Sequence, residues 1–268
     1  DGRESSEYSR SELAIKAGYI STEIVRASNM RVYDLVALGR FPHTGWTGSN
    51  DPEGQAAIAS ALDKTGMTGF SNRYVSELSD GERQRAMIAR VLAQETDILI
   101  MDEPTAFLDI SGRYEMIHLM SGLAREGRTI LFSTHDFNIA LNQADKIWLI
   151  FDDSLIEGSP EDLVLSGAFN NLFDPGIVGF NHRDGTFSLR PEKRGALFVR
   201  GEGITRDWTI KALARAGYTV SDNYSVPYLI TPGGETVKWV IVLENSSVEF
   251  ESIYSLAEWL VKNKNLIS

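Results

Sequence analysis

The chain has 268 residues, of which 26 are Lys or Arg and 37 are Asp or Glu, giving a formal net charge of −11. Hydrophobic residues make up 43% and charged residues 24%, which is typical of a folded chain with a sizeable core and excludes disorder as its main state. Cysteine is absent, which excludes disulfides, zinc sites with Cys ligands and thiol catalysis. The acidic balance argues against nucleic acid as a partner, because phosphate neutralisation supplies most of that affinity.

Short apolar strands and helices alternate along the first part of the chain. The pattern predicts strands at 18–21, 97–101, 129–133 and 146–151, and helices at 55–65, 80–94, 111–125 and 137–143. In the helix at 80–94 the apolar residues share one face. Strands that are apolar throughout and alternate with helices indicate a parallel sheet that is covered on both faces.

A polar, turn-rich stretch at 190–195 predicts a domain boundary, after which the pattern starts again. Beyond it we expect strands at 196–200, 228–231 and 238–243, and helices at 205–216 and 252–262. The sequence therefore predicts a domain at 1–190 and a smaller α/β domain at 191–268. Gly201-Glu202-Gly203 follows the first of these strands; it lacks the third glycine of a dinucleotide fingerprint and is more typical of a plain tight turn.

Two carboxylates follow the apolar strand at 97–101, at Asp102 and Glu103. The carboxyl edge of a parallel sheet is where α/β folds bind ligands. The first carboxylate suits a hydrated Mg²⁺, and the second suits a general base that orients a water for attack on a phosphoryl group. An isolated Asp-Glu pair more often ends a strand and caps the next element, but the neighbouring motifs favour the functional interpretation here.

A second motif, Leu78-Ser79-Asp80-Gly81, opens the helix at 80–94. The free backbone N–H groups and the positive dipole end of a helix attract an anion. Ser79 adds a hydroxyl donor, and Gly81 lets the backbone approach a ligand closely. Ser79 and Glu82 also match a capping box, and one helix end is able to serve both purposes.

A histidine follows the next strand, in the segment Ser133-Thr134-His135-Asp136. A histidine at this place is able to hydrogen-bond a phosphate or the attacking water. Taken alone, it would more often be structural. The remaining histidines, His43, His118 and His182, show no partner spacing, and we expect them to be structural.

In their order along the chain, the segments 78–81, 98–103, Leu108-Asp109 and 133–136 resemble the signature motif, Walker B motif, D-loop and H-loop of ATP-binding cassette (ABC) ATPases. The resemblance covers roughly residues 9–173. The resemblance implies a P-loop NTPase-like α/β fold with a helical subdomain at about 29–93. It implies the following site residues: Ser79 and Gly81 in the signature loop, Asp102 for the metal, Glu103 as catalytic base, Asp109 as the D-loop acid and His135 as the switch histidine. The segment 36–46 resembles the helical subdomain of ATPases that power import of iron chelates, haem and vitamin B12.

The main departure from the family is that no Gly-Lys pair occurs in the sequence. A phosphate-cradling loop, Gly-x-x-x-x-Gly-Lys-[Ser/Thr], needs this pair. In the family the loop precedes the region matching 9–21, so we expect an N-terminally incomplete domain that lacks its Walker A region and is inactive alone. The alternative is a natural protein that has lost the loop.

Smaller departures affect single positions of the motifs. Thr22 occupies the place of the family's Q-loop Gln. Asp80 and Glu82 replace a Gly and a Gln of the signature, and Ala106 stands where a D-loop Ser is common. An acid at Asp80 should repel a bound γ-phosphate unless its side chain points away or helps to cap its helix.

The resemblance implies ATP and Mg²⁺ as cofactors, and an ATP-hydrolysing importer subunit for iron chelates, haem or cobalamin. It implies a homodimer, integral membrane permease subunits and, indirectly, a periplasmic substrate-binding protein. The location would be the cytoplasmic face of the plasma membrane, reached through a protein partner because the chain is acidic. A second hypothesis is a non-catalytic partner that supplies only its signature loop to another subunit, or a regulatory protein.

Overall fold

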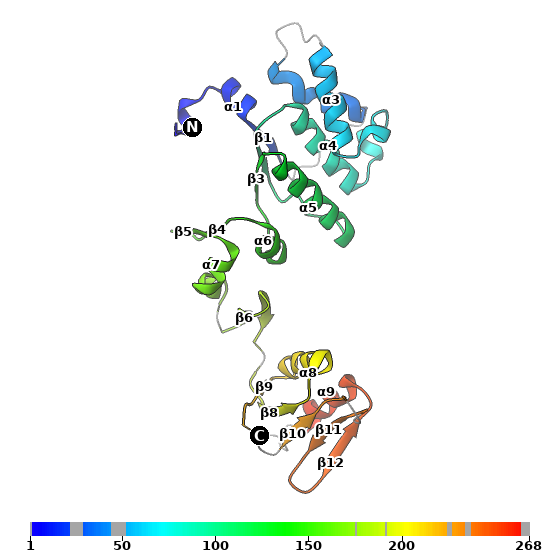
Figure 1. The fold of residues 1–268 in the computed structure, drawn as a ribbon, viewed down its shortest axis with the longest axis vertical. Helices are drawn as coiled ribbons and strands as arrows, with labels where there is room; N and C mark the ends of the chain where they lie inside the picture. The colour runs from blue at the N-terminus through cyan, green and yellow to red at the C-terminus, as the bar shows by residue number, and fades with distance from the viewer. Residues whose placement is uncertain are drawn as a thin grey trace. The chain divides into compact units, whose positions relative to one another are not determined.

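The computed structural model describes residues 2–21, 29–43, 52–174, 176–190, 192–223, 227–233 and 237–263. The chain divides into two compact units, Asp1–Ile147 and Trp148–Ser268 (Figure 1). The boundary near residue 190 stays a prediction. In the described residues, no helix combines the length and the apolar composition that crossing a membrane requires.

A three-stranded parallel sheet forms the centre of the first unit. Its strands, in the order β1-β2-β3, are β1 (Ala17–Ile20), β2 (Ile98–Met101) and β3 (Thr129–Phe132). The register pairs Tyr19 with Ile100 and Ile100 with Leu131, so all three strands end at the same edge. The predicted parallel α/β arrangement is confirmed for these strands, and their carboxyl ends meet where the sequence motifs follow.

Two expectations about this sheet are wrong. The strand at 146–151 does not extend it: β4 (Ile147–Ile150) pairs with β5 (Leu155–Gly158) in a separate two-stranded sheet. The sheet is also not covered on both faces, since no residue of β3 is fully buried and Leu131 is 38% exposed. Apolar composition shows that a strand is able to be buried, but the cover has to come from other elements, and β3 is an edge strand among the described residues.

Helices of the first unit pack on this sheet and on one another. They are α1 (Arg10–Lys16), α2 (Val32–Ala37), α3 (Pro52–Lys64), α4 (Asp80–Ala93), α5 (Ile110–Arg125) and α6 (Phe137–Gln143), with short 3₁₀ turns η1 (Ser5–Glu7), η2 (Leu38–His43), η3 (Thr68–Phe70) and η4 (Val75–Glu77). Figure 1 shows α3 and α4 lying side by side. The buried residues of β1, β2 and α2–α6 form one continuous core.

α4 is the central helix of this packing, and it buries seven of its residues. Ala86, Ala89, Leu92 and Ala93 are all buried, as their predicted common face requires. η2 approaches α4 so closely that a Cβ on Gly39 would lie 1.9 Å from the carbonyl oxygen of Arg90. This close approach explains the glycine at that position.

η2 is tied to the C-terminal end of α4 by two side chains. The buried Arg40 donates to the carbonyl oxygen of Ala93 (2.9 Å) and forms an ion pair with Glu95. His43 Nε2 lies 2.8 Å from the carbonyl oxygen of Gln94. His43 therefore has the structural role that the sequence predicts.

The described residues of the second unit form two small two-stranded sheets and one larger sheet. Its elements are β4, β5, α7 (Pro160–Leu165), η5 (Ala168–Asn171), β6 (Val178–Asn181), β7 (Thr186–Leu189), β8 (Gly195–Arg200), α8 (Gly203–Arg215), β9 (Tyr218–Val220), β10 (Tyr228–Ile230), β11 (Trp239–Val242), β12 (Ser247–Phe250) and α9 (Ile253–Lys262). Phe169, Phe180 and Phe187 stack around the β6–β7 hairpin, with the centroids of Phe180 and Phe187 4.8 Å apart. His182 joins this cluster and has hydrogen-bond partners at both ring nitrogens, which fits a structural role.

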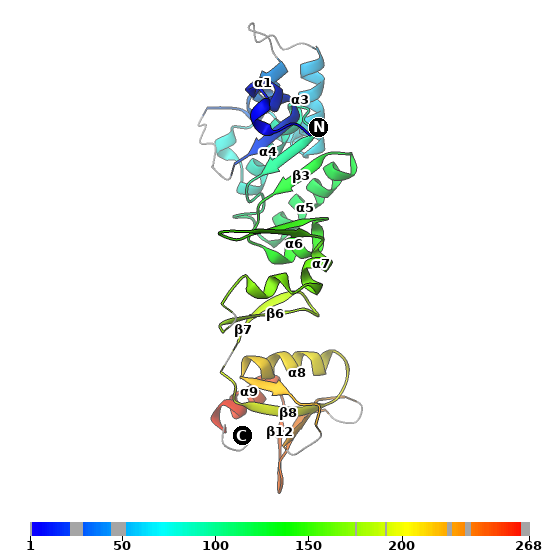
Figure 2. The same cartoon turned by 90° about the vertical axis from the view of Figure 1, so that its left-hand side faces the viewer.

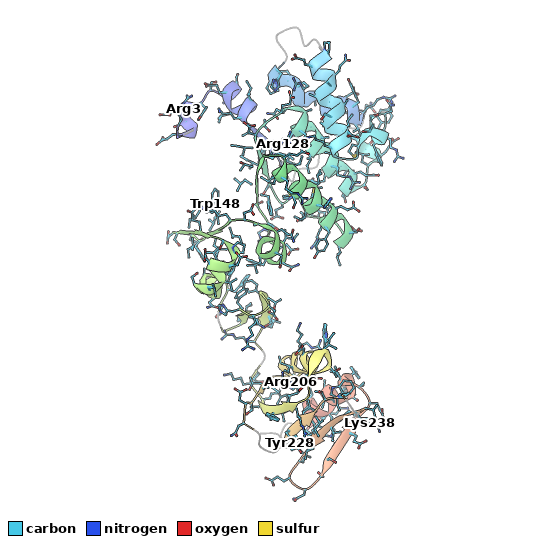
Figure 3. The ribbon with its side chains drawn as sticks, viewed as in Figure 1. Arg3, Arg128, Trp148, Arg206, Tyr228 and Lys238 are labelled. Carbon is cyan, nitrogen blue, oxygen red and sulfur yellow. The ribbon has the colours of Figure 1, made fainter. Side chains whose placement is uncertain are left out.

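A five-stranded sheet in the order β12-β11-β10-β8-β9 forms the last part of the chain, with α8 and α9 packed on it (Figure 2). Its core is a cluster of its own that includes Leu197, Leu229 and Leu260. Gly201 has φ +141°, and a Cβ there would lie 1.9 Å from Thr231 Oγ1, so packing explains the first glycine of this turn. Lys238, labelled in Figure 3, forms ion pairs with Glu249 and Glu251.

Candidate functional site

The site lies at the carboxyl edge of the β1–β2–β3 sheet. Met101 and Phe132 are the last residues of β2 and β3, and they are paired in register. The next residues of each strand, Asp102 and Ser133, are therefore neighbours. The strand hydrogen bonds continue into them, since the Asp102 N–H donates to the Ile20 carbonyl and the Ser133 N–H to the Met101 carbonyl. Strand pairing thus fixes the backbone at the start of both loops.

Ser133 connects the carboxylate of Asp102 to the backbone of Glu103. Its hydroxyl donates to Asp102 Oδ1 at 2.6 Å and accepts from the backbone N–H of Glu103 at 2.9 Å. The Ser133 hydroxyl thus fixes one oxygen of Asp102 and the start of the loop that contains Glu103.

Glu103 and His135 form the central pair of the site. His135 Nε2 lies 2.6 Å from Glu103 Oε1, and the imidazole side chain is 92% exposed. Glu103 has φ +45°, and Phe107, four residues on, has φ +62°. Left-handed backbone is uncommon for such residues and is enriched at functional sites, although Glu95, outside this site, also has φ +56°. The loop after β2 therefore has a strained backbone at Glu103, and the Glu103 carboxylate points to the exposed His135.

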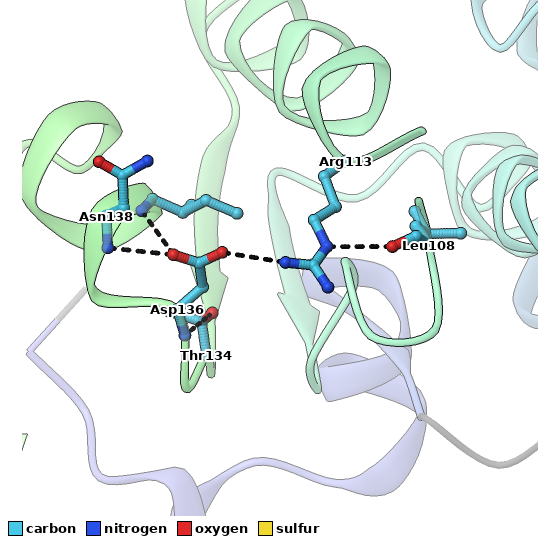
Figure 4. Close-up of polar contacts among 6 residues, drawn as sticks. Leu108, Arg113, Thr134, Asp136 and Asn138 are labelled. Atoms are coloured by element: carbon cyan, nitrogen blue, oxygen red, sulfur yellow. Dashed lines mark hydrogen bonds and ion pairs between the residues drawn. The ribbon is translucent and has the colours of Figure 1, made fainter. Parts of the chain in front are cut away.

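A cavity of about 380 Å³ opens between the loops after β2 and β3. It is lined by Glu103, Thr105, Ala106, Arg113 and residues 134–137. Arg113 crosses it from α5: its Nε donates to the Leu108 carbonyl (3.0 Å) and its Nη1 to Asp136 Oδ2 (3.3 Å), as Figure 4 shows. Asp136 also caps α6 by accepting from the N–H groups of Asn138 and Ile139. Arg113 therefore links the loop that ends at Asp109 to the loop of His135.

Asp109 caps α5 by accepting from the Gly112 N–H at 2.7 Å. Ala106, which stands where a D-loop serine is common, donates its N–H to the Glu103 carbonyl (3.0 Å) in the turn between the two motifs. The structure therefore shows Asp109 as the N-cap of α5.

Ser79 and Gly81 lie at the start of α4. Ser79 forms a capping box with Glu82, in which Ser79 Oγ accepts from the Glu82 N–H (3.3 Å) and Glu82 Oε2 from the Ser79 N–H (2.8 Å). This last hydrogen bond, from the Ser79 backbone, is the main reason that the pKa of Glu82 is lowered. A Cβ on Gly81 would lie 3.7 Å from Leu108, so the turn is next to the D-loop segment.

The side chain of Asp80 is paired within its own helix. Its Oδ1 accepts from Arg83 Nη1 at 2.8 Å, and Arg83 also donates to the Leu78 carbonyl (2.9 Å). Arg83 thereby offsets the acid that would repel a phosphate near this helix end. The N-cap residue is Ser79, so Asp80 is not itself the cap, which was one of the two alternatives that the sequence left open for this acid.

The structure thus places Asp102, Glu103 and His135 at one edge of the sheet, and the roles that the sequence suggests for them stay predictions. Ser79 is hydrogen-bonded instead to Glu82 of its own helix turn. Thr22 lies outside the described residues. The sequence analysis did not single out Ser133 or Arg113. Ser133 follows a predicted strand, which was a signal, but its partners Asp102 and Glu103 are identified only by the register of β2 against β3.

Mg²⁺ fits the donors at this edge. Asp102 offers a carboxylate to a hard ion that prefers oxygen ligands. In the part of the chain that the structure describes, three or more acidic or histidine side chains do not gather into a cage for a metal. Mg²⁺ needs no such cage, since it usually keeps several waters and binds one or two carboxylates together with substrate phosphates.

Paired carboxylates and a histidine at the carboxyl edge of a parallel sheet define an α/β protein of the class that suits phosphoryl transfer. Comparison with known proteins agrees: residues 1–106 match the ABC transporter family model, and residues 194–261 match the model of an iron ABC transporter C-terminal domain. The chain belongs to the family of ABC transporter ATP-binding proteins.

Individual relatives support this assignment. An uncharacterized ABC transporter ATP-binding protein of Methanocaldococcus jannaschii is 35% identical over 213 residues, which are 78% of this chain and 73% of that protein. The ferric enterobactin transport ATP-binding protein FepC of Escherichia coli is 35% identical over 65% of each chain. A solved metal-chelate type ABC transporter in an inward-facing conformation matches with a TM-score of 0.56 and 27% identity, over 59% of this chain and 64% of that one. The chain thus spans about two thirds to three quarters of the length of these proteins.

Proposed function

We propose that this protein is the ATP-hydrolysing subunit of an ABC importer for iron chelates. The observation that supports this most directly is the contact of His135 with Glu103 beside Asp102, at the edge where the strands end. The substrate class rests on FepC, whose name states ferric enterobactin transport, and on the match of residues 194–261 to an iron transporter C-terminal domain.

In the proposed mechanism, Glu103 is the general base. Its carboxylate accepts a proton from the attacking water and orients that water toward the γ-phosphate. His135 holds the carboxylate through Oε1, which leaves Oε2 for the water. Asp102 would hold Mg²⁺, which when bound neutralises charge on the phosphate oxygens.

Ser79 and Gly81 act, in this proposal, on nucleotide bound mainly by the other subunit of the proposed homodimer. The N-terminus of α4 presents backbone N–H groups and a positive dipole end, which suit a phosphate. Asp109 caps α5, and Arg113 of the same helix links the loop that ends at Asp109 to the loop of His135. We propose that these contacts connect the start of α4, which faces the second subunit, to the hydrolytic residues. The sequence contains no Gly-Lys pair, so the phosphate-cradling loop of the proposed site is not supplied by these residues.

The membrane permease is proposed to contact η2. Leu38 is 51% exposed and Phe41 is 78% exposed, although Arg40 and His43 of the same turn are fixed to the end of α4. A rigid turn that presents two large apolar side chains is suited to hold an apolar partner surface. A location at the cytoplasmic face of the membrane and indirect cooperation with a periplasmic binding protein follow from this role.

The test is transport by the natural polypeptide reconstituted with its permease in proteoliposomes. We expect ATP hydrolysis that a ferric chelate and its binding protein stimulate, and uptake that Phe41→Ala weakens while Tyr254→Ala, on the exposed face of α9, leaves it unchanged. Absence of ATP hydrolysis in the reconstituted complex would refute the proposed activity. Hydrolysis that responds only to a different solute would refute the substrate class.

A second candidate function is that of a non-catalytic partner which supplies its signature loop to another subunit. The missing Gly-Lys pair favours it. Calorimetric titration of Mg-ATP into the 268-residue chain separates the two: Kd near 1 μM, which corresponds to about −8 kcal/mol, requires a complete site of its own. Binding that appears only in the presence of a second, loop-bearing subunit supports the partner role.

A further inference from the structure

The hydroxyl of Ser133 lies between the carboxylate of Asp102 and the backbone N–H of Glu103. Its hydroxyl has one proton to donate. The carboxylate of Asp102 only accepts hydrogen bonds and the backbone N–H of Glu103 only donates, so the direction of both contacts is fixed. The proton of Ser133 points to Asp102 Oδ1 (2.6 Å), and its lone pair faces the Glu103 N–H (2.9 Å).

The contact to Glu103 lies where the backbone needs support. With φ +45°, Glu103 occupies a left-handed region that is unfavourable for a non-glycine residue and persists only when its surroundings hold it. The loop after β3 contacts Glu103 at two points, the backbone N–H through Ser133 and the carboxylate through His135. The same loop therefore fixes both ends of this residue.

We propose that Ser133 is a positioning residue of the hydrolytic site, which holds the strained backbone of Glu103 and turns the Asp102 carboxylate toward the metal. The proposal rests on the proposed ATP hydrolysis for its catalytic consequence. Its structural content, one hydroxyl that joins the two carboxylate residues, does not depend on that function.

The first experiment compares Ser133→Thr with Ser133→Val, which have nearly the same shape and differ in the hydroxyl. Hydrogen exchange of the Glu103 amide is measured by NMR on the nucleotide-free chain. We expect Thr to keep the protection of the wild type and Val to speed exchange of this amide about tenfold or more, since a hydrogen bond to the amide is lost. Equal exchange in the two variants, with equal melting temperatures, would overturn the proposal.

The second experiment measures the Mg²⁺ dependence of ATP hydrolysis in the natural polypeptide with its permease. We expect Ser133→Val, and also Ser133→Ala, to raise the half-maximal Mg²⁺ concentration about tenfold and to lower kcat, with rescue by Thr. An unchanged Mg²⁺ requirement in both variants, beside an active wild type, contradicts the positioning role. An inactive wild type refutes the proposed function instead, and the amide exchange then decides the inference alone.

Discussion

Ser79→Ala tests the reasoning about how α4 begins. The chain contains a matched pair of capping boxes, Ser79 with Glu82 and Ser9 with Glu12, and both have the same distances of 2.8 and 3.3 Å. α4 has 14 residues and buries seven of them, whereas α1 has seven residues and buries none. The two caps thus have the same geometry, but Ser79 begins a helix that is part of the core and Ser9 begins a helix with no buried residue.

Loss of a Ser cap costs about 1 kcal/mol. We expect Ser79→Ala to lower the opening free energy of the buried amides of α4 by about this amount, because α4 opens together with the core. Ser9→Ala should leave those amides unchanged, since α1 frays locally. Native-state hydrogen exchange of α4 is the assay. Equal effects of both variants, or none from Ser79→Ala, would refute the argument.

The same capping box predicts a dependence of stability on pH. The lowered pKa of Glu82 means that the folded chain binds this proton less tightly than the unfolded chain. Its contribution is therefore present above the ordinary Glu pKa of about 4.3 and is lost as the pH falls through the lowered value. Because the main cause is the backbone N–H of Ser79, Ser79→Ala should keep most of this dependence and Glu82→Gln should remove it. Urea unfolding followed by circular dichroism between roughly pH 3 and pH 6 measures both.

Three further predictions concern glycine packing in the first unit, the contacts of Arg113 in the site and a buried tyrosine of the second unit. Gly39→Ala should lower the free energy of unfolding of the first unit by roughly 1–3 kcal/mol, because the new Cβ clashes with the backbone of α4. Gly122→Ala, with open space around it in α5, should raise the free energy of unfolding by roughly 0.5–1 kcal/mol. Thermal unfolding of the two variants measures both effects. Arg113→Met should lower kcat more than ATP affinity in the reconstituted complex, and equal activity would remove the proposed link between the D-loop and the loop of His135. Burial raises the pKa of Tyr218, so its phenol should ionise above the ordinary value of about 10 in an ultraviolet titration, with Tyr218→Phe as the control.

The sequence was most informative where chemistry follows directly from strand ends. Asp102, Glu103 and His135 each follow an apolar strand, and parallel strands end at one edge, so their common location could be predicted. Their choice as candidate site residues needed the order of the neighbouring motifs as well, because each alone would more often be structural. Ser133 could not be assigned a role, because its partners depend on the register of Met101 against Phe132. Elements with few residues were also missed, since short helices and strands give little periodicity.

Some missed features had a local signal and others had none. The β6–β7 hairpin turns through residues 182–185, a loop that ends in Asp184-Gly185, and Asp and Gly are typical turn residues. The buried Arg40 had no such signal, because its partners at the end of α4 are more than 50 residues away along the chain. The exposure of β3 could not be foreseen either, as composition does not state which elements cover a strand.

The role of Glu103 is the central claim, and Glu103→Gln tests it most directly. In the natural polypeptide with its permease, single-turnover hydrolysis of ATP should fall about 100-fold or more while ATP stays bound, since loss of a general base costs 10²–10⁴-fold. Glu126→Gln is the control, an exposed carboxylate paired with Lys64. Hydrolysis at the rate of the wild type, or loss of ATP binding, would contradict the assignment of Glu103 as the base.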